Sequence, residues 1–83
     1  MEVGEILNEI NQIFVNVLDN PGIVLNAQTS AKDIEEWDSL THIQLIVAIE
    51  KHFKLKFTSM EIQRWKNVGE ILASIKNRLD SHA

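Results

Sequence analysis

Residues 35–53, EEWDSLTHIQLIVAIEKHF, constrain the fold more than any other stretch of this chain. The segment opens with polar residues and is then largely apolar from Leu40 to Phe53, which predicts a helix that begins at Asp38 or Ser39. Either side chain can accept hydrogen bonds from the unpaired N–H groups of a first helical turn. If Asp38 is the cap, the Ser39 hydroxyl is free, and an anion attached to it lies at the positive end of the helix dipole.

The apolar face of this predicted helix is unusually wide. Its members fall on one stripe and a second row beside it, namely Leu40, Ile43, Ile46, Val47 and Phe53, then Leu45 and Ile49. So wide an apolar face predicts a helix that packs against neighbours on more than one side.

A first amphipathic helix is predicted over Val3–Leu18, because Ile6, Ile10, Ile13, Phe14 and Val17 recur at helical spacing. Asn20-Pro21-Gly22 should end it, since proline cannot continue a helix and glycine accepts the left-handed conformation. A long loop over residues 19–38 follows. We expect its apolar residues to anchor it on the core: Ile23, Val24, Leu25, Ile34 and Trp37.

Three further start signals predict shorter elements. Ser30 and Asp33 have the spacing of a capping box and favour one helical turn near residues 31–36. Thr58 with Glu61 predicts a short helix that runs through Ile62 to Trp65. Asn67 with Glu70 predicts a last helix that ends near Arg78 or Asp80. The fold class is therefore all-α: a four-helix bundle of three main helices and one short one, in a single domain of residues 1–83.

Composition excludes several kinds of protein. The 83 residues contain no cysteine, so no disulfide or thiolate exists, and any thiol chemistry must come from a bound or attached group. No apolar run is long enough to span a bilayer, and the acidic start MEVGEILNEI is unlike a signal peptide. We expect a cytoplasmic protein, acting as a monomer without a membrane.

The net charge of −4 is unevenly distributed. Residues 1–38 carry eight acids against one lysine, whereas residues 39–83 carry four acids against seven bases. An acidic first half argues against a nucleic-acid partner and for docking on basic protein surfaces. The basic residues of the second half are expected to form a solvated face or a docking rim: Lys51, Lys54, Lys56, Arg64 and Lys66.

Catalytic and metal sites find little support. Asp38, Ser39 and His42 lack the order of a Ser-His-acid relay and carry no oxyanion-hole sequence, so plain capping by Ser39 is the stronger interpretation of that motif by itself. The three histidines, His42, His52 and His82, have no metal-ligand spacing and are expected on the surface. Trp37 and Trp65 are expected to anchor a loop and a short helix.

With these elements predicted, the chain resembles the acyl carrier proteins over nearly its whole length, from about Val3 to Leu79. The resemblance is carried by WDSLTHIQLIVAIEKHF, by the extended KLKF and by the two helices after it. The sharpest likeness is Asp38-Ser39-Leu40 between a long loop and the second helix. The resemblance implies a four-helix bundle in which a separate transferase attaches 4′-phosphopantetheine from coenzyme A to Ser39. It also implies a shuttle for acyl thioesters and not an enzyme.

By the same resemblance, the partners are the phosphopantetheinyl transferase and acyl-loading and acyl-processing enzymes. They would dock on the second helix and the loops near it, at Glu36, Asp38, Leu40, Thr41, Gln44 and Glu50. An acyl chain would shelter between helices, among Val47, Phe57, Ile62 and Trp65, although ordinary core packing explains these residues equally well.

The chain departs from the family pattern along its second helix. Thr41, Gln44 and Lys51 occupy positions where housekeeping fatty-acid carriers usually have acids, and only Glu50 is kept. This favours a dedicated carrier in a specialised lipid, polyketide or amino-acyl pathway. Two alternatives stay open: a housekeeping carrier for fatty-acid synthesis, and a helical protein-interaction domain without a cofactor.

Overall fold

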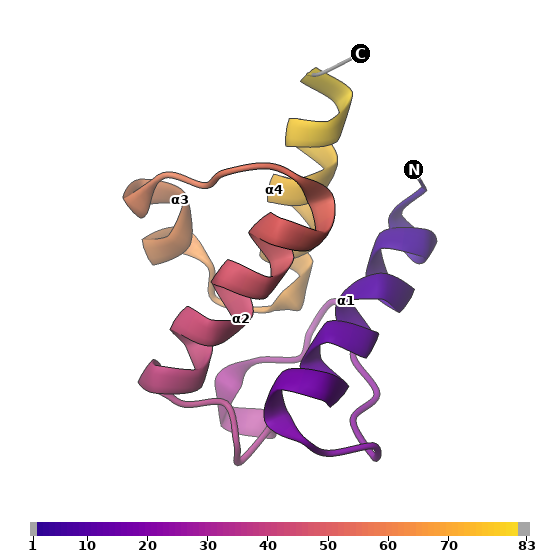
Figure 1. Ribbon diagram of the computed structural model, residues 1–83, viewed down its shortest axis with the longest axis vertical. Coiled ribbons are helices and arrows are strands. Elements are labelled where there is room, and N and C mark those ends of the chain that lie inside the picture. Colours follow the sequence, from indigo (N-terminus) through magenta and orange to yellow (C-terminus); the bar gives the residue numbers. More distant parts are fainter. Residues whose placement is uncertain (1, 82–83) are drawn as a thin grey trace.

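Four α-helices and one short 3₁₀ turn make up the computed structural model, which describes residues 2–81. Within that range there is no strand, so the predicted all-α class is confirmed. Figure 1 shows α1 along one side of the molecule, with α2 and α4 both beside it and the short α3 beyond α2. The elements are, in order, α1 Val3–Leu18, the 3₁₀ turn Ala31–Asp33, α2 Ser39–Phe53, α3 Ser59–Arg64 and α4 Val68–Ser81.

One hydrophobic core joins the three longer helices. From α1, Ile6, Ile10 and Phe14 are fully buried, at the spacing that keeps residues on one helix face. They meet buried residues of α2 and α4: Leu45, Ile49, Val68, Ile71 and Ile75. Since a buried side chain of this size stabilises the fold by about 1.5–3 kcal/mol, this cluster supplies the main driving force for folding.

The end of α1 differs from the sequence expectation. The helix does stop before Pro21, but the residue in the left-handed conformation is Asp19, with φ 53°, and its N–H bonds the carbonyl of Val15. Gly22 does not have a positive φ, so the role expected of this glycine was wrong. Aspartate tolerates the left-handed region better than most side chains, which explains how the turn forms at Asp19, three residues before Gly22.

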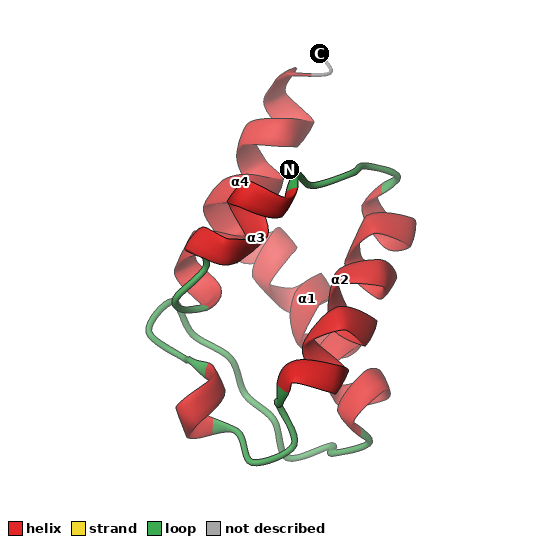
Figure 2. Ribbon diagram, turned by 90° about the vertical axis from the view of Figure 1, so that its left-hand side faces the viewer, coloured by secondary structure: helices red, strands yellow, loops and turns green. Residues whose placement is uncertain are grey.

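The long loop between α1 and α2, which the 3₁₀ turn interrupts (Figure 2), is fastened to α1 and to α4 by hydrogen bonds at residues 23–29. Asn11 of α1 holds it from one side: its amide donates to the carbonyl of Ile23 at 3.1 Å, and its oxygen accepts from the N–H of Leu25 at 2.7 Å. Farther along, the carbonyls of Ala27 and Thr29 accept from the first N–H groups of α4, at Gly69 and Val68.

Most of the apolar loop residues are anchors as expected, because Ile23, Leu25, Ile34 and Trp37 are buried. Val24 is the exception and is 84% exposed. It lies between two residues whose backbone is bonded to Asn11. In such an extended segment, successive side chains point to opposite sides, so burying Ile23 and Leu25 turns Val24 outward.

The predicted packing of α2 was partly wrong. Its buried face is formed by Leu45, Ile46 and Ile49. Leu40, Ile43 and Val47, which were expected to pack against neighbours, are 67%, 60% and 43% exposed. These three residues, hereafter the outer stripe, follow helical spacing, and they face solvent because α1 contacts the other side of the helix.

Candidate functional site

Asp38 is the cap of α2, and this leaves the Ser39 hydroxyl available. The Asp38 Oδ1 atom accepts from the backbone N–H groups of Leu40 at 3.0 Å and Thr41 at 2.9 Å. Ser39 is then the first residue of the helix, and its side chain is exposed. No other described residue hydrogen-bonds its hydroxyl. The alternative in which Ser39 itself is the cap is therefore wrong.

A reciprocal bond fixes the geometry of this turn. The Thr41 hydroxyl accepts from the backbone N–H of Asp38 at 2.8 Å and donates to the carbonyl of Glu36 at 2.7 Å. Hydrogen bonding from the backbone of Thr41, opposed by a smaller cost of burial, lowers the pKa of the Asp38 carboxyl. The cap is thus a carboxylate at neutral pH, and Ser39 is held rigidly between two bonded neighbours.

An aromatic cluster lies behind the turn. The Trp37 indole Nε1–H donates to Nδ1 of His42 at 3.0 Å, and the two rings stack with centroids 6.0 Å apart. Trp65 meets His42 edge-on at 6.4 Å, and its own indole N–H donates to the Ser74 hydroxyl at 2.8 Å. His42 is half-buried in this cluster, so the expectation of a surface histidine was wrong for it.

The bond from Trp37 determines the state of His42. Because Nδ1 accepts, a neutral ring carries its proton on Nε2. Burial lowers the pKa of His42, which keeps the ring neutral at pH 7. His52, by contrast, is exposed and lies 2.7 Å from Glu9 of α1, while His82 lies outside the described residues.

A cavity of about 300 Å³ opens between Ser39 and this cluster. Trp37, His42 and Trp65 form its aromatic walls, and Ile71 of α4 adds an apolar surface. Polar groups of Lys66 and Asn67, in the connection just before α4, also line it. The cavity therefore offers apolar and aromatic surfaces to a group that is attached at Ser39.

The structure separates the four residues that were predicted to shelter an acyl chain. Trp65 lines the cavity beside Ser39, and Phe57 packs against it edge-on with ring centroids 4.8 Å apart. Ile62 is half-buried in α3. Val47 instead lies in a groove of α2 together with Lys51 and Lys54. Sequence reasoning missed Trp37 and His42 as cavity walls, and no spacing signalled them, because Trp37 lies in the loop before α2 and His42 lies within the helix.

The residues predicted for docking all lie on or next to α2, but several have structural bonds. Leu40 and Gln44 are exposed, whereas the Glu36 carboxylate accepts from the Asn20 amide at 3.1 Å. The Glu50 carboxylate accepts from the backbone N–H of Phe57 at 2.9 Å and so fixes the connection between α2 and α3. Ile43, on the outer stripe, is 60% exposed but was not among the docking predictions.

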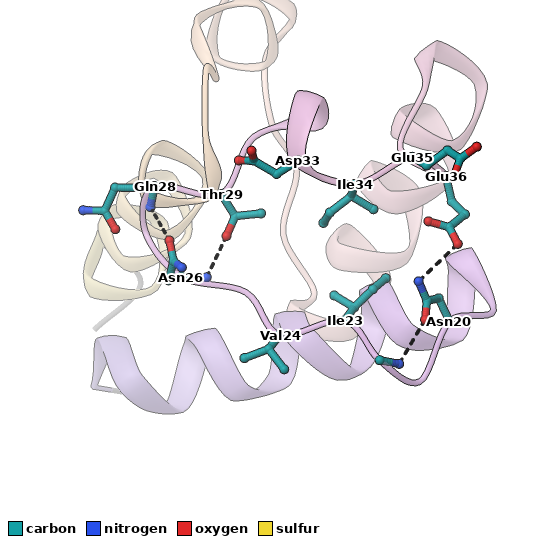
Figure 3. Close-up of a pocket in the computed structure, with 11 residues that line it drawn as sticks. Asn20, Ile23, Val24, Asn26, Gln28, Thr29, Asp33, Ile34, Glu35 and Glu36 are labelled. Atoms are coloured by element: carbon teal, nitrogen blue, oxygen red, sulfur yellow. Dashed lines mark hydrogen bonds between the residues drawn. The ribbon is translucent and has the colours of Figure 1, made fainter.

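A larger open hollow of about 720 Å³ lies in the long loop (Figure 3). Figure 3 shows Ile23 and Ile34 pointing toward each other across it, and Asn20 bridging Gly22 and Glu36 at one end. Asp33, Glu35 and Glu36 line it, and these carboxylates lie within five residues before Asp38. The loop that leads into the N-terminal end of α2 is therefore acidic.

The part of the chain that the structure describes contains neither a candidate metal site nor a membrane-spanning helix. No group of three or more histidine, cysteine, aspartate or glutamate side chains in residues 2–81 is placed to hold a metal ion. Within the same range, no helix has the length and apolar content required to cross a membrane.

Comparisons with known proteins agree with this geometry. The family model for the phosphopantetheine attachment site matches residues 6–75. An acyl carrier protein of Thermosynechococcus vestitus is 30% identical over 80 residues, which are 95% of this chain and 98% of the relative. A second, from Phytoplasma mali, is 38% identical over 45 residues, 54% of each chain. The solution structure of a holo acyl carrier protein from Geobacter metallireducens superposes with a TM-score of 0.87 at 43% identity, covering 92% of this chain and 87% of that one.

Proposed function

Since the chain belongs to the acyl carrier protein family and carries covalent 4′-phosphopantetheine, we propose that Ser39 is the attachment residue and that the cargo belongs to a dedicated pathway. Acyl carrier proteins are carriers rather than catalysts. The attached group supplies a thiol, which forms thioesters and which the 83 residues of this chain do not contain. The single observation that carries the assignment is the exposed Ser39 hydroxyl, which has no hydrogen-bond partner among residues 2–81 because Asp38 is the cap.

The turn fits a phosphodiester in two respects and opposes it in one. The hydroxyl lies at the N-terminus of a 15-residue helix, where the backbone dipole favours negative charge. It is also exposed, so a transferase can approach it. The adjacent Asp38 carboxylate repels an anion, but its charge is already shared with two backbone N–H groups.

Partner enzymes, namely a phosphopantetheinyl transferase and acyl-loading and acyl-processing enzymes, would dock around this turn. In our proposal, Leu40 supplies the apolar contact beside Ser39, and Glu36 and Asp38 attract basic residues of the partner. Thr41 and Glu50 are hydrogen-bonded within the fold, so they contribute to docking indirectly, by fixing the backbone at the two ends of α2. Gln44 is an exposed neutral neighbour on the same helix.

The surface of α2 supports a dedicated pathway. Its exposed side presents the apolar outer stripe and Gln44, and Glu50 is bonded to the backbone of Phe57. A partner that recognises a continuous row of acids would find few of them. Because each exposed ion pair contributes only about 0–1 kcal/mol, the lost acids change the choice of partner more than the stability of the fold.

Incubation with coenzyme A and a broad-specificity phosphopantetheinyl transferase, followed by mass spectrometry of the intact protein, tests the attachment residue. The wild type should gain one phosphopantetheine and Ser39→Ala none. Ser59→Ala is a matched control, because Ser59 is also an exposed first helical residue behind a bonded cap, Thr58. An unmodified wild type, or Ser39→Ala that is still modified, would contradict the proposal.

The pathway requires a separate test. A general fatty-acid synthase should acylate this holo protein far more slowly than its own carrier. Equal rates would favour the housekeeping alternative. A Ser39→Ala chain that retains full function in its own cells would instead favour an interaction domain that needs no cofactor.

A further inference from the structure

The C-terminal end of α2 carries a groove that is basic and partly apolar. The groove has a volume of about 470 Å³ and is lined by Val47, Glu50, Lys51, Lys54, Leu55 and Lys56. All three lysine side chains are exposed. Across residues 2–81, no carboxylate forms an ion pair with any of them.

Glu50, the single acid among the groove residues, neutralises only part of the positive charge of the three lysines. The Glu50 carboxylate accepts the backbone N–H of Phe57 at 2.9 Å, which directs it toward the connection between α2 and α3. His52, the other basic residue in the last turn of α2, is turned to Glu9 of α1 at 2.7 Å. The three lysines therefore present their charge outward and together.

The groove continues the outer stripe. Val47 belongs to both, and Lys51 lies one helical turn after Val47 on the same side of α2. At the opposite end of the stripe, Leu40 lies two residues after Asp38 and four residues after Glu36. The exposed face of α2 thus runs from an acidic end, across apolar side chains, to a basic end.

We propose that an acyl-processing partner docks across this face and places an acidic, leucine-bearing segment in the groove of Val47, Lys51, Lys54 and Lys56. The inference rests on the proposed function, since it assigns a partner chemistry to the same helix. The apolar side chains supply buried area, and charges of opposite sign at the two ends determine the orientation of the partner along α2.

Charge arrangement favours a protein over a lipid surface or a nucleic acid. Both of those offer negative charge along their whole extent, so the acidic end of α2 would be repelled wherever the basic end is attracted. A protein surface can present acids at one end and bases at the other. It also offers apolar side chains of the size of the outer stripe.

Titration of the ¹⁵N-labelled protein, in apo and holo forms, tests the inference. The probes are a synthetic amphipathic helix with leucines at helical spacing and glutamates between them, the same peptide with lysines, and phosphatidylglycerol vesicles. We expect the acidic peptide alone to shift the amide signals of Val47, Lys51 and Lys54 to saturation. Lys51→Glu and Lys54→Glu should each weaken its binding about two- to fivefold, and added salt should weaken it further.

Lys32→Glu is the matched control, because Lys32 is an exposed lysine of the 3₁₀ turn, outside the groove. Absent binding, equal loss in the Lys32 variant, or a response of the groove to the lysine peptide or the vesicles would overturn the inference. Modification of Ser39 by the transferase is measured on the same variants. Its failure would refute the proposed function, whereas normal modification without peptide binding would refute the inference alone.

Discussion

The hydrogen bond between Trp37 and His42 gives a direct test of how the cluster behind Ser39 is stabilised. Trp37 is only 7% exposed, and its indole N–H donates a hydrogen bond to Nδ1 of His42 at 3.0 Å. Replacing His42 with leucine keeps a side chain of similar bulk but removes the acceptor. The indole N–H is then left unpaired in an environment that water reaches poorly.

The expected cost follows from these contacts. An unpaired buried donor costs about 1–3 kcal/mol, and the added apolar surface of a half-buried leucine offsets up to roughly 1 kcal/mol of it. We expect a net loss of about 1 kcal/mol in the free energy of unfolding. In a domain of this size that lowers Tm by about 4–8 °C.

Urea unfolding followed by circular dichroism, with a double-mutant cycle, isolates the bond. Trp37→Phe removes the donor, so in that background His42→Leu should cost nothing or be slightly stabilising. The coupling free energy should be about 1–2 kcal/mol. Additive effects within about 0.5 kcal/mol would show that the bond does not stabilise the cluster and would refute the reasoning.

Three further predictions concern pH, close packing and the long loop. Burial lowers the pKa of His42, so the contribution of its neutral ring to stability is complete above about pH 6.5 and is lost as the pH falls toward the pKa of His42 in the folded state. Thermal melts from about pH 7.5 to 5 should therefore show a decline in Tm for the wild type and a flatter profile for His42→Leu. Gly69→Ala would place a Cβ 2.9 Å from the carbonyl oxygen of Ala27 and should destabilise by about 1–3 kcal/mol in urea unfolding, whereas Gly4→Ala meets nothing within 4 Å and should stabilise by about 0.5–1 kcal/mol. Asn11→Ala should cost about 1–3 kcal/mol and speed hydrogen exchange in the loop, and unchanged exchange would contradict the anchoring role of its amide.

Local signals in the sequence predicted the helix boundaries well. The capping boxes at Ser30, Asp38 and Thr58 each lie within four residues, so residue type and spacing suffice to identify them. Because such capping signals are local, the sequence also identified Asp38 as a candidate cap, which would leave the Ser39 hydroxyl free. It could not decide between the two caps, because both side chains can accept the same N–H groups.

Features that depend on distant neighbours were harder to predict. The apolar residues of α2 cover so wide a face that composition does not reveal which side α1 will contact, and the outer stripe was therefore predicted to be buried. His42 was assigned to the surface because its burial depends on Trp65, 23 positions later in the chain. The left-handed turn at Asp19 was assigned to the nearby glycine, which has the higher intrinsic preference.

The central claim is that the hydroxyl of Ser39 carries phosphopantetheine, and tandem mass spectrometry of the protein isolated from its own cells tests it most directly. Trypsin should release residues 33–51, a peptide in which Ser39 and Thr41 are the only hydroxyl side chains. We predict phosphopantetheine on Ser39, because the Thr41 hydroxyl is bonded to Asp38 and Glu36. An unmodified peptide, or the group on Thr41, would contradict the assignment.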